Sequence, residues 1–129
     1  MLNKKYLQNI IIPLINAFND KEQCTIKDFK LTSKILKLKR FYKDDIEELQ
    51  EQFNTLQEKY FKEPTFEVNE NGTFKSGEIK DYESFIVDNI ELLKEEIKEY
   101  EAKFTLEDFE GSEIAHWVIN LLDDAGLLE

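Results

Sequence analysis

Residues 35–60 read ILKLKRFYKDDIEELQEQFNTLQEKY, and apolar side chains recur in this stretch every three or four residues. The repeating positions are Ile35, Leu38, Tyr42, Ile46, Leu49, Phe53, Leu56 and Tyr60. This spacing predicts a heptad seam along one helix, which would run about 39 Å at ~1.5 Å per residue. Because the intervening positions are charged or amide, the seam must pack against other helices of the chain or against a second copy.

The aromatic residues of the seam bear on that choice. Tyr42, Phe53 and Tyr60 occupy seam positions where a dimeric zipper usually has Leu, Ile or Val. We therefore favour a mixed helical bundle, mainly α with a minor β component, in a single domain over residues 1–129. At 129 residues the chain is long enough to bury a core of its own.

The remaining elements follow from local signals on either side of the seam. Thr25 with Asp28 resembles a capping box, which starts the long helix at about residue 26, and Pro64 ends it at about 62. Asn71-Gly72 between alternating apolar and polar residues predicts a β-hairpin over about 65–80.

Two C-terminal helices are expected, over about 82–98 and 112–124, with a short alternating strand at 100–106 between them. Asp81 would cap the first, and Gly126 followed by two leucines would end the second. An earlier apolar pattern over 4–19 predicts an N-terminal helix that Pro13 kinks or restarts.

Charge is divided unevenly along the chain. Residues 1–43 carry ten Lys and Arg against three acids, a net charge of +7, whereas residues 44–129 carry −18, which gives the total of −11. The sign changes inside the long helix. The candidate partner-binding residues are the carboxylates Glu47, Glu48, Glu51 and Glu58 and the cations Lys30, Lys34 and Lys37, which share a helical face.

The cations suit an ion-pair face, within the molecule or between subunits, better than a nucleic-acid site, because the acidic remainder repels DNA. A single Cys, Cys24, excludes an internal disulfide and favours a reducing, cytoplasmic compartment. The stretch 1–15 lacks a cleavage site, and we find no membrane span, small-molecule substrate or cofactor signature.

Residues 67–78 partly match a calcium-binding loop. Glu67, Asn69, Asn71, Thr73 and Glu78 fall at ligand positions, with Gly72 at the turn. Glu67 is too long for its position, however, and Lys75 would lie beside the ion, so the hairpin explains these residues better. His116, the only histidine, and Cys24 have no partner residues at metal-ligand or catalytic spacing, so no catalytic or metal site is predicted.

A resemblance rests on the order of several segments: residues 29–38, the Glu/Gln-rich helix up to Phe61, the turn at 69–72, the helix from Phe85 to Leu93, and the stretch 104–109. In this layout the chain resembles small uncharacterised acidic proteins encoded by tailed bacteriophages of low-GC bacteria. The resemblance implies a phage origin, non-enzymatic work, and a place in the host cytoplasm or in the virion. It transfers no functional residues.

Two functional hypotheses follow. The first is a phage-type structural or interaction module that acts through helix packing and charge complementarity, on itself as a homo-oligomer or on another protein. The second is a small acidic inhibitor that imitates nucleic acid and binds a host defence or DNA-binding protein. Neither hypothesis involves an enzyme.

Overall fold

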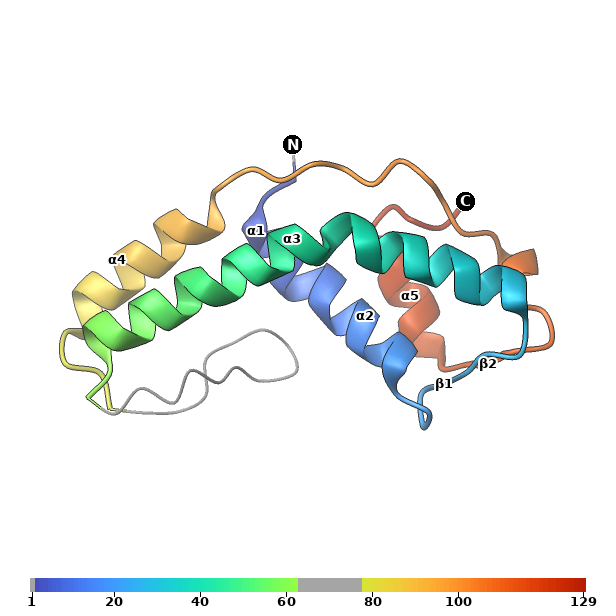
Figure 1. The fold of residues 1–129 in the computed structure, drawn as a ribbon, viewed down its shortest axis with the longest axis horizontal. Helices are drawn as coiled ribbons and strands as arrows, with labels where there is room; N and C mark the ends of the chain where they lie inside the picture. The colour runs from blue at the N-terminus through green and yellow to red at the C-terminus, as the bar shows by residue number, and fades with distance from the viewer. Residues whose placement is uncertain (1, 63–77) are drawn as a thin grey trace.

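A computed structural model describes residues 2–62 and 78–129 of this chain. The fold is mainly α with a minor β component, as the sequence predicted. One helix, α3 (Phe29–Tyr60), runs the length of the molecule, and the other elements pack along it (Figure 1). Helices α2 (Ile12–Asn19) and α5 (His116–Asp124) lie beside its N-terminal half, and α4 (Tyr82–Leu93) lies beside its C-terminal half.

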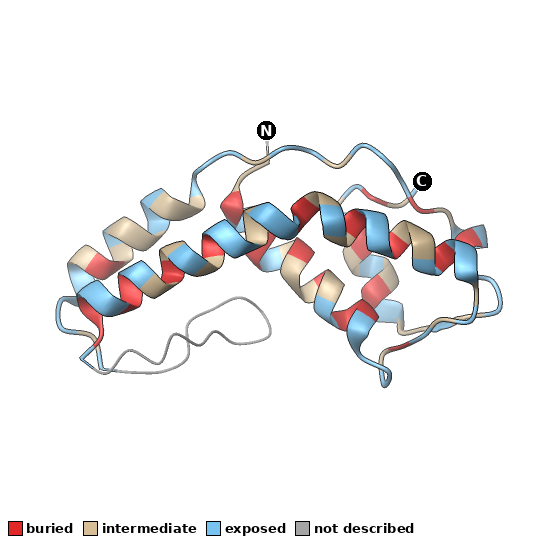
Figure 2. Ribbon diagram, in the orientation of Figure 1, coloured by how far each residue is buried: buried red, intermediate tan, exposed pale blue. Residues whose placement is uncertain are grey.

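The heptad seam of α3 is the core-facing stripe of the fold. Seven of its eight predicted residues are buried, and Ile46 is half-buried; the buried ones are Ile35, Leu38, Tyr42, Leu49, Phe53, Leu56 and Tyr60. Figure 2 shows buried residues of α3 that recur between exposed ones along the whole helix. The seam is therefore covered by other elements of the same chain, as a mixed bundle requires.

The start of α3 differs from the predicted one. Asp28 itself is the N-cap, and its side chain accepts a hydrogen bond from the Lys30 N–H at 2.9 Å. Thr25 instead lies in the strand β1 (Cys24–Thr25). The predicted capping box was wrong, because it required Thr25 at the N-cap and Asp28 as the third residue of the helix. Asp28 instead occupies the N-cap position, where a short side chain that accepts a hydrogen bond is favoured.

The N-terminal helical stretch accommodates Pro13 without stopping. It consists of α1 (Lys4–Tyr6), a π-helical segment η1 (Leu7–Ile11) and α2. The Ile12 N–H donates to the Leu7 carbonyl, five residues back. Since a proline lacks the N–H and crowds the carbonyl four residues before it, the wider π spacing lets the chain continue past it.

Helix α4 is shorter than predicted. Asp81 caps it as expected, accepting from the Ser84 N–H at 3.2 Å, but the helix ends at Leu93 and not near residue 98. The chain beyond it is drawn onto the N-terminus, where the Lys4 N–H donates to the Glu95 carbonyl and the Ile97 N–H donates to the Leu2 carbonyl. These bonds replace the next helical turn, a long-range effect that local periodicity does not reveal.

From residue 94 the chain runs extended along α3 towards the other end of the molecule (Figure 1). The predicted strand at 100–106 is reduced to one bridge, where Phe104 pairs with Leu128 in parallel. A single 3-10 turn, η2 (Leu106–Phe109), follows and carries a capping box between Thr105 and Asp108. Of the alternating apolar residues, Phe104 is buried and Tyr100 is half-buried, whereas Ala102 and Leu106 are exposed, so the alternation does not mark a buried strand face.

The last helix also begins later than predicted. Residues Glu113–Ile114 form the strand β2, which pairs antiparallel with β1, and α5 starts at His116. Its predicted end is confirmed: Gly126 has φ +71°, and Leu127 is buried. A positive φ at this position favours glycine, because a Cβ there would be strained.

The predicted β-hairpin and calcium loop fall almost entirely outside the described residues. At the border, Phe61 bridges Ile79 in antiparallel fashion, and Lys62 pairs with Glu78 at 2.6 Å. Within the described ranges the sheet is the β1–β2 pair, at the opposite end of α3.

The apolar interior consists of two clusters. The larger joins α2, η1, η2, α5 and α3 as far as Phe53, with Phe18, Phe104 and Phe109 among its members. The smaller lies where α3 meets α4 and comprises Leu56, Tyr60, Phe61 and Phe85. Together they fix α3 at both ends and leave its polar faces to solvent.

Candidate functional site

Three of the predicted carboxylates, Glu47, Glu51 and Glu58, lie with Asp44 on the exposed side of α3. Asp44, Glu47, Glu51 and Glu58 are all exposed, and their spacing of three, four and seven residues places them on one helical face. At 1.5 Å per residue this acidic face extends about 21 Å. We use the term acidic face for these four residues below.

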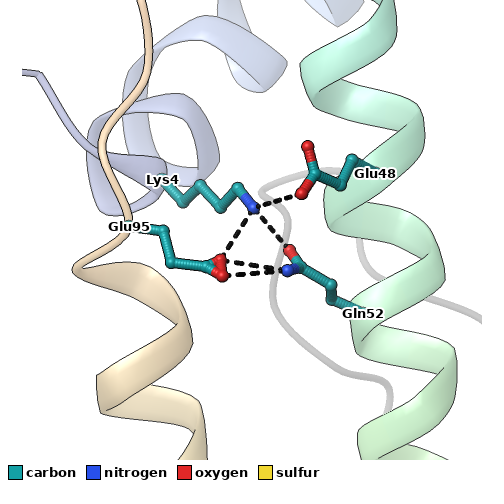
Figure 3. Close-up of polar contacts among 4 residues, drawn as sticks. All are labelled: Lys4, Glu48, Gln52 and Glu95. Carbon is teal, nitrogen blue, oxygen red and sulfur yellow. Dashed lines mark hydrogen bonds and ion pairs between the residues drawn. The ribbon is translucent and has the colours of Figure 1, made fainter.

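Glu48 has a different role from the other three predicted carboxylates. Its Oε1 accepts from Lys4 Nζ at 3.2 Å, and the same ammonium donates to Gln52 Oε1 at 2.7 Å and to Glu95 Oε2 at 2.9 Å (Figure 3). Gln52 in turn donates to the Glu95 carboxylate. This Lys4 cluster (Lys4, Glu48, Gln52 and Glu95) joins α1, α3 and the segment that follows α4.

Burial and charge in the Lys4 cluster are asymmetric. The Lys4 side chain is only 4% exposed, whereas those of Glu48 and Glu95 are 57% and 44% exposed. The hydrogen bond from Lys4, followed by those from Gln52, holds the pKa of the Glu95 carboxyl below its usual range. The cluster satisfies a buried cation, so its first role is structural.

The predicted cations are also divided by the structure. Lys34 Nζ pairs with Asp108 Oδ2 at 2.5 Å and lies 6.0 Å from the centre of the Phe104 ring. Lys30 and Lys37 are exposed and take part in no ion pair within the ranges that the structure describes. The three therefore do not form one binding stripe, because Lys34 holds η2 against α3.

The surroundings of Asp108 favour its ionised form, which pairs with the Lys34 ammonium. Burial raises the pKa of its carboxyl, but the hydrogen bonds from Lys34 and from the Thr105 N–H outweigh burial, so its pKa lies below the ordinary value. The Thr105 N–H donates to Asp108 Oδ2 at 2.8 Å. Asp108 thereby connects the cap of η2 to the basic end of α3.

A groove next to the acidic face was not predicted from the sequence. It has a volume of about 610 Å³ and lies between α3 and the extended segment; its lining is Leu2, Phe41, Asp44, Asp45, Glu96, Ile97, Lys98 and Glu99. Four carboxylates against one lysine make the groove acidic, and Phe41 contributes an aromatic side chain. We call it the acidic groove.

Aromatic contacts fix the extended segment that forms one wall of this groove. The Tyr100 N–H donates to the Tyr42 hydroxyl at 3.3 Å, and the Phe41 and Tyr100 rings lie 5.1 Å apart. Burial raises the pKa of the Tyr42 hydroxyl. Because tertiary contacts such as this one bring Glu96 and Glu99 to α3, no local signal in the sequence could place them beside Asp44.

Cys24 and His116, the other side chains considered for catalysis or metal binding, do not form part of a reactive site among the described residues. Cys24 is buried in the β1–β2 pair, where burial and then the Asp20 carboxylate raise the pKa of its thiol. His116 is exposed at the start of α5. Across residues 2–62 and 78–129, no group of His, Cys, Asp and Glu is arranged to hold a metal ion.

Comparisons of the chain with protein-family models, with curated proteins and with solved structures found no match. The described helices include none that is long and apolar enough to cross a membrane.

Proposed function

We propose that this chain is a non-enzymatic protein-interaction module, of the phage type that the layout of its sequence resembles, and that it binds a basic partner protein. The observation that carries the proposal is the acidic groove, which continues along α3 into the acidic face. Its carboxylates and the Phe41 ring suit lysine and arginine side chains, since a guanidinium pairs with carboxylates and stacks on aromatic faces.

The buried seam supports this choice of surface over self-association. A heptad seam that its own chain covers is not available for a coiled coil with a second copy, so homo-oligomerisation would need another face. The exposed charge of α3 remains, and complementary charge accelerates association and selects partners.

The second candidate, a nucleic-acid mimic, is supported by the same exposed carboxylates. Their spacing argues for the first candidate, however, because successive charges of the acidic face are separated by about 4.5–10.5 Å along α3. Duplex DNA presents about one charge per 1.7 Å of axis. The acidic face is thus a sparse copy of a phosphate backbone.

The test is an NMR titration of the ¹⁵N-labelled protein with an arginine-rich decapeptide, at low and at physiological salt. We expect amide shifts at Phe41, Asp44 and Glu99, with an affinity that falls as salt rises. The variant D44K/E47K/E51K should lose this binding. The matched control D123K/D124K/E129K, which makes the same charge change on exposed α5 and C-terminal residues, should keep it.

Equal loss in both triple variants would refute the site, because only net charge would then matter. Competition between the protein and duplex DNA for a sequence-independent DNA-binding protein distinguishes the two candidates. Displacement of DNA that D44K/E47K/E51K abolishes would favour the mimic.

A further inference from the structure

A second hollow, unrelated to the acidic groove, lies between α2 and α5. Its volume is about 600 Å³, and its lining is Pro13, Asn16, Ala17, Asn19, Asp20, Gln23 and Trp117. A volume of this size is within the range of small-molecule sites. We call it the Trp117 groove.

Trp117 is held in place by one hydrogen bond and is exposed. Its indole Nε1–H donates to Gln23 Oε1 at 2.7 Å, and 46% of the residue is accessible to solvent. Since the only polar atom of the ring is already bonded, what the side chain offers a ligand is its apolar surface.

Three polar side chains of the groove use only part of their hydrogen-bonding capacity within the protein. Asn19 Oδ1 accepts from Lys39 Nζ, Asp20 Oδ1 accepts from the Glu22 N–H at 2.9 Å, and Gln23 Oε1 accepts from Trp117. Within the described parts of the chain, the amide nitrogens of Asn19 and Gln23 and the second oxygen of Asp20 have no hydrogen-bond partner. These groups supply donors and an acceptor to one hollow.

The charge of the lining selects the class of ligand. Asp20 is the one charged lining residue, and the Lys39 ammonium lies beside the lining on Asn19 Oδ1, so the two opposite charges offset one another and neither an anion nor a multiply charged cation is favoured. A neutral molecule with both donors and acceptors fits best. A sugar ring meets this description, because its hydroxyls donate and accept while its C–H face packs on an indole.

We propose that the Trp117 groove binds a neutral saccharide of one to three units. The sugar face packs on Trp117, and its hydroxyls bond to Asn19, Asp20 and Gln23. This site lies apart from the acidic groove, shares no lining residue with it, and extends the function of the chain beyond the binding of a basic protein.

Trp117 is the only tryptophan of the chain, so its fluorescence reports directly on the groove. The full chain is titrated with chitotriose, maltotriose and lactose, and with sialyllactose and a proline-rich decapeptide as comparators. We expect a saturable fluorescence change with at least one neutral sugar and none with sialyllactose or the peptide.

Two variants test the assignment of the polar groups. Asn19→Ala and Asp20→Ala, both at exposed positions, should each weaken sugar binding by about tenfold or more. Each removes a hydrogen bond to the sugar, and a loss of about 1.4 kcal/mol in binding free energy corresponds to a tenfold rise in Kd. Asp124→Ala, on α5 outside the groove, should bind as the parent does. Far-UV circular dichroism verifies that each variant is folded.

Three outcomes would overturn the proposal. The first is a flat fluorescence signal with every neutral sugar up to about 20 mM, where a millimolar Kd would show binding. The second is unchanged binding in both Asn19→Ala and Asp20→Ala. The third is a response confined to the proline-rich peptide, which would make the hollow a peptide groove.

Discussion

The ionised carboxylate of Asp108 stabilises the folded chain, because Lys34 and the Thr105 N–H bind it. Its pKa is lower in the folded chain than in the unfolded one, where an aspartate titrates at about 3.9. A depressed pKa contributes stability above the unfolded value, and the contribution is lost as pH falls through the folded value. We therefore expect Asp108→Asn to lower the free energy of unfolding by about 1–2 kcal/mol at neutral pH.

Urea unfolding of this variant and of the parent, at neutral pH and at about pH 2.5, measures the difference. The gap between the two proteins should narrow as the pH falls, because Asp108 is progressively protonated and loses the charge that asparagine never carries. Glu107→Gln, at the exposed neighbouring position, makes the same charge change and should have little effect. A gap that stays constant with pH would mean that the Lys34–Asp108 charge pair contributes nothing.

Lys4 is the residue that fastens the N-terminus to the rest of the molecule. We expect Lys4→Met, which keeps the apolar stem, to lower the free energy of unfolding by about 1–2 kcal/mol. The loss is moderate because the freed carboxylates of Glu48 and Glu95 are exposed and can be hydrated.

Hydrogen exchange at the Ile97 N–H, which donates to the Leu2 carbonyl at 3.0 Å, gives the local measurement. In Lys4→Met its protection should fall more than the global stability requires, because the N-terminal segment loses its ion pairs. Lys5→Met, at an exposed site, is the control. Equal effects of the two substitutions would show that the Lys4 cluster does not hold this segment.

Among the elements, α3 depends on its seam. Leu49 is 1% exposed and Leu36 is 42% exposed, although both are leucines of the same helix. Leu49→Ala should lower the free energy of unfolding by about 2–5 kcal/mol through the cavity that it leaves. Leu36→Ala should change it by less than about 0.5 kcal/mol.

Urea unfolding at two protein concentrations separated by a factor of a hundred completes this test. If the seam is covered within one chain, Leu49→Ala will not change how the urea midpoint depends on protein concentration. A midpoint that rises with concentration in the parent and in Leu36→Ala, but not in Leu49→Ala, would show that copies pair through the seam.

The long helix could be predicted because its signals are local and repeated. Eight apolar positions over 26 residues define the helical period even though one step of the heptad is irregular. Asp81 at the start of α4 and Gly126 after α5 were also predictable, because a helix cap depends only on residues next to it in the sequence. The helix boundaries that were predicted wrongly, the end of α4 and the start of α5, depend on contacts between residues far apart in the sequence. Residues 94–98 leave the helix to bond with residues 2–4, and residues 113–114 leave it to pair with residues 24–25.

The candidate sites divide in the same way. Periodicity placed Glu47, Glu51 and Glu58 on one exposed face, but it could not show that Glu48 faces Lys4. Glu96 and Glu99 entered the acidic groove through the extended segment, and Trp117 met Gln23 across 94 residues of sequence. Such pairs become visible only when the tertiary contacts are known.

At the scale of the whole molecule, charge opposes folding. The chain has a net charge of −11, and the acidic face adds like charges along one side of α3. The compact state brings these charges closer together than the unfolded chain does, so their repulsion lowers stability. Salt screens such repulsion, since the Debye length falls from about 30 Å at 0.01 M to about 8 Å at 0.15 M.

We therefore expect the urea midpoint to rise as sodium chloride increases from about 0.01 M to 0.15 M, the range in which screening reaches the spacing of the acidic face. The variant E47K/E51K/E58K, with a net charge of −5, should be more stable than the parent at low salt and should respond less to added salt. A midpoint that falls with salt in the parent would show that attractive ion pairs, such as those of Lys4 and Lys34, outweigh the repulsion. A parent and variant with equal slopes would place the repulsion elsewhere than on α3.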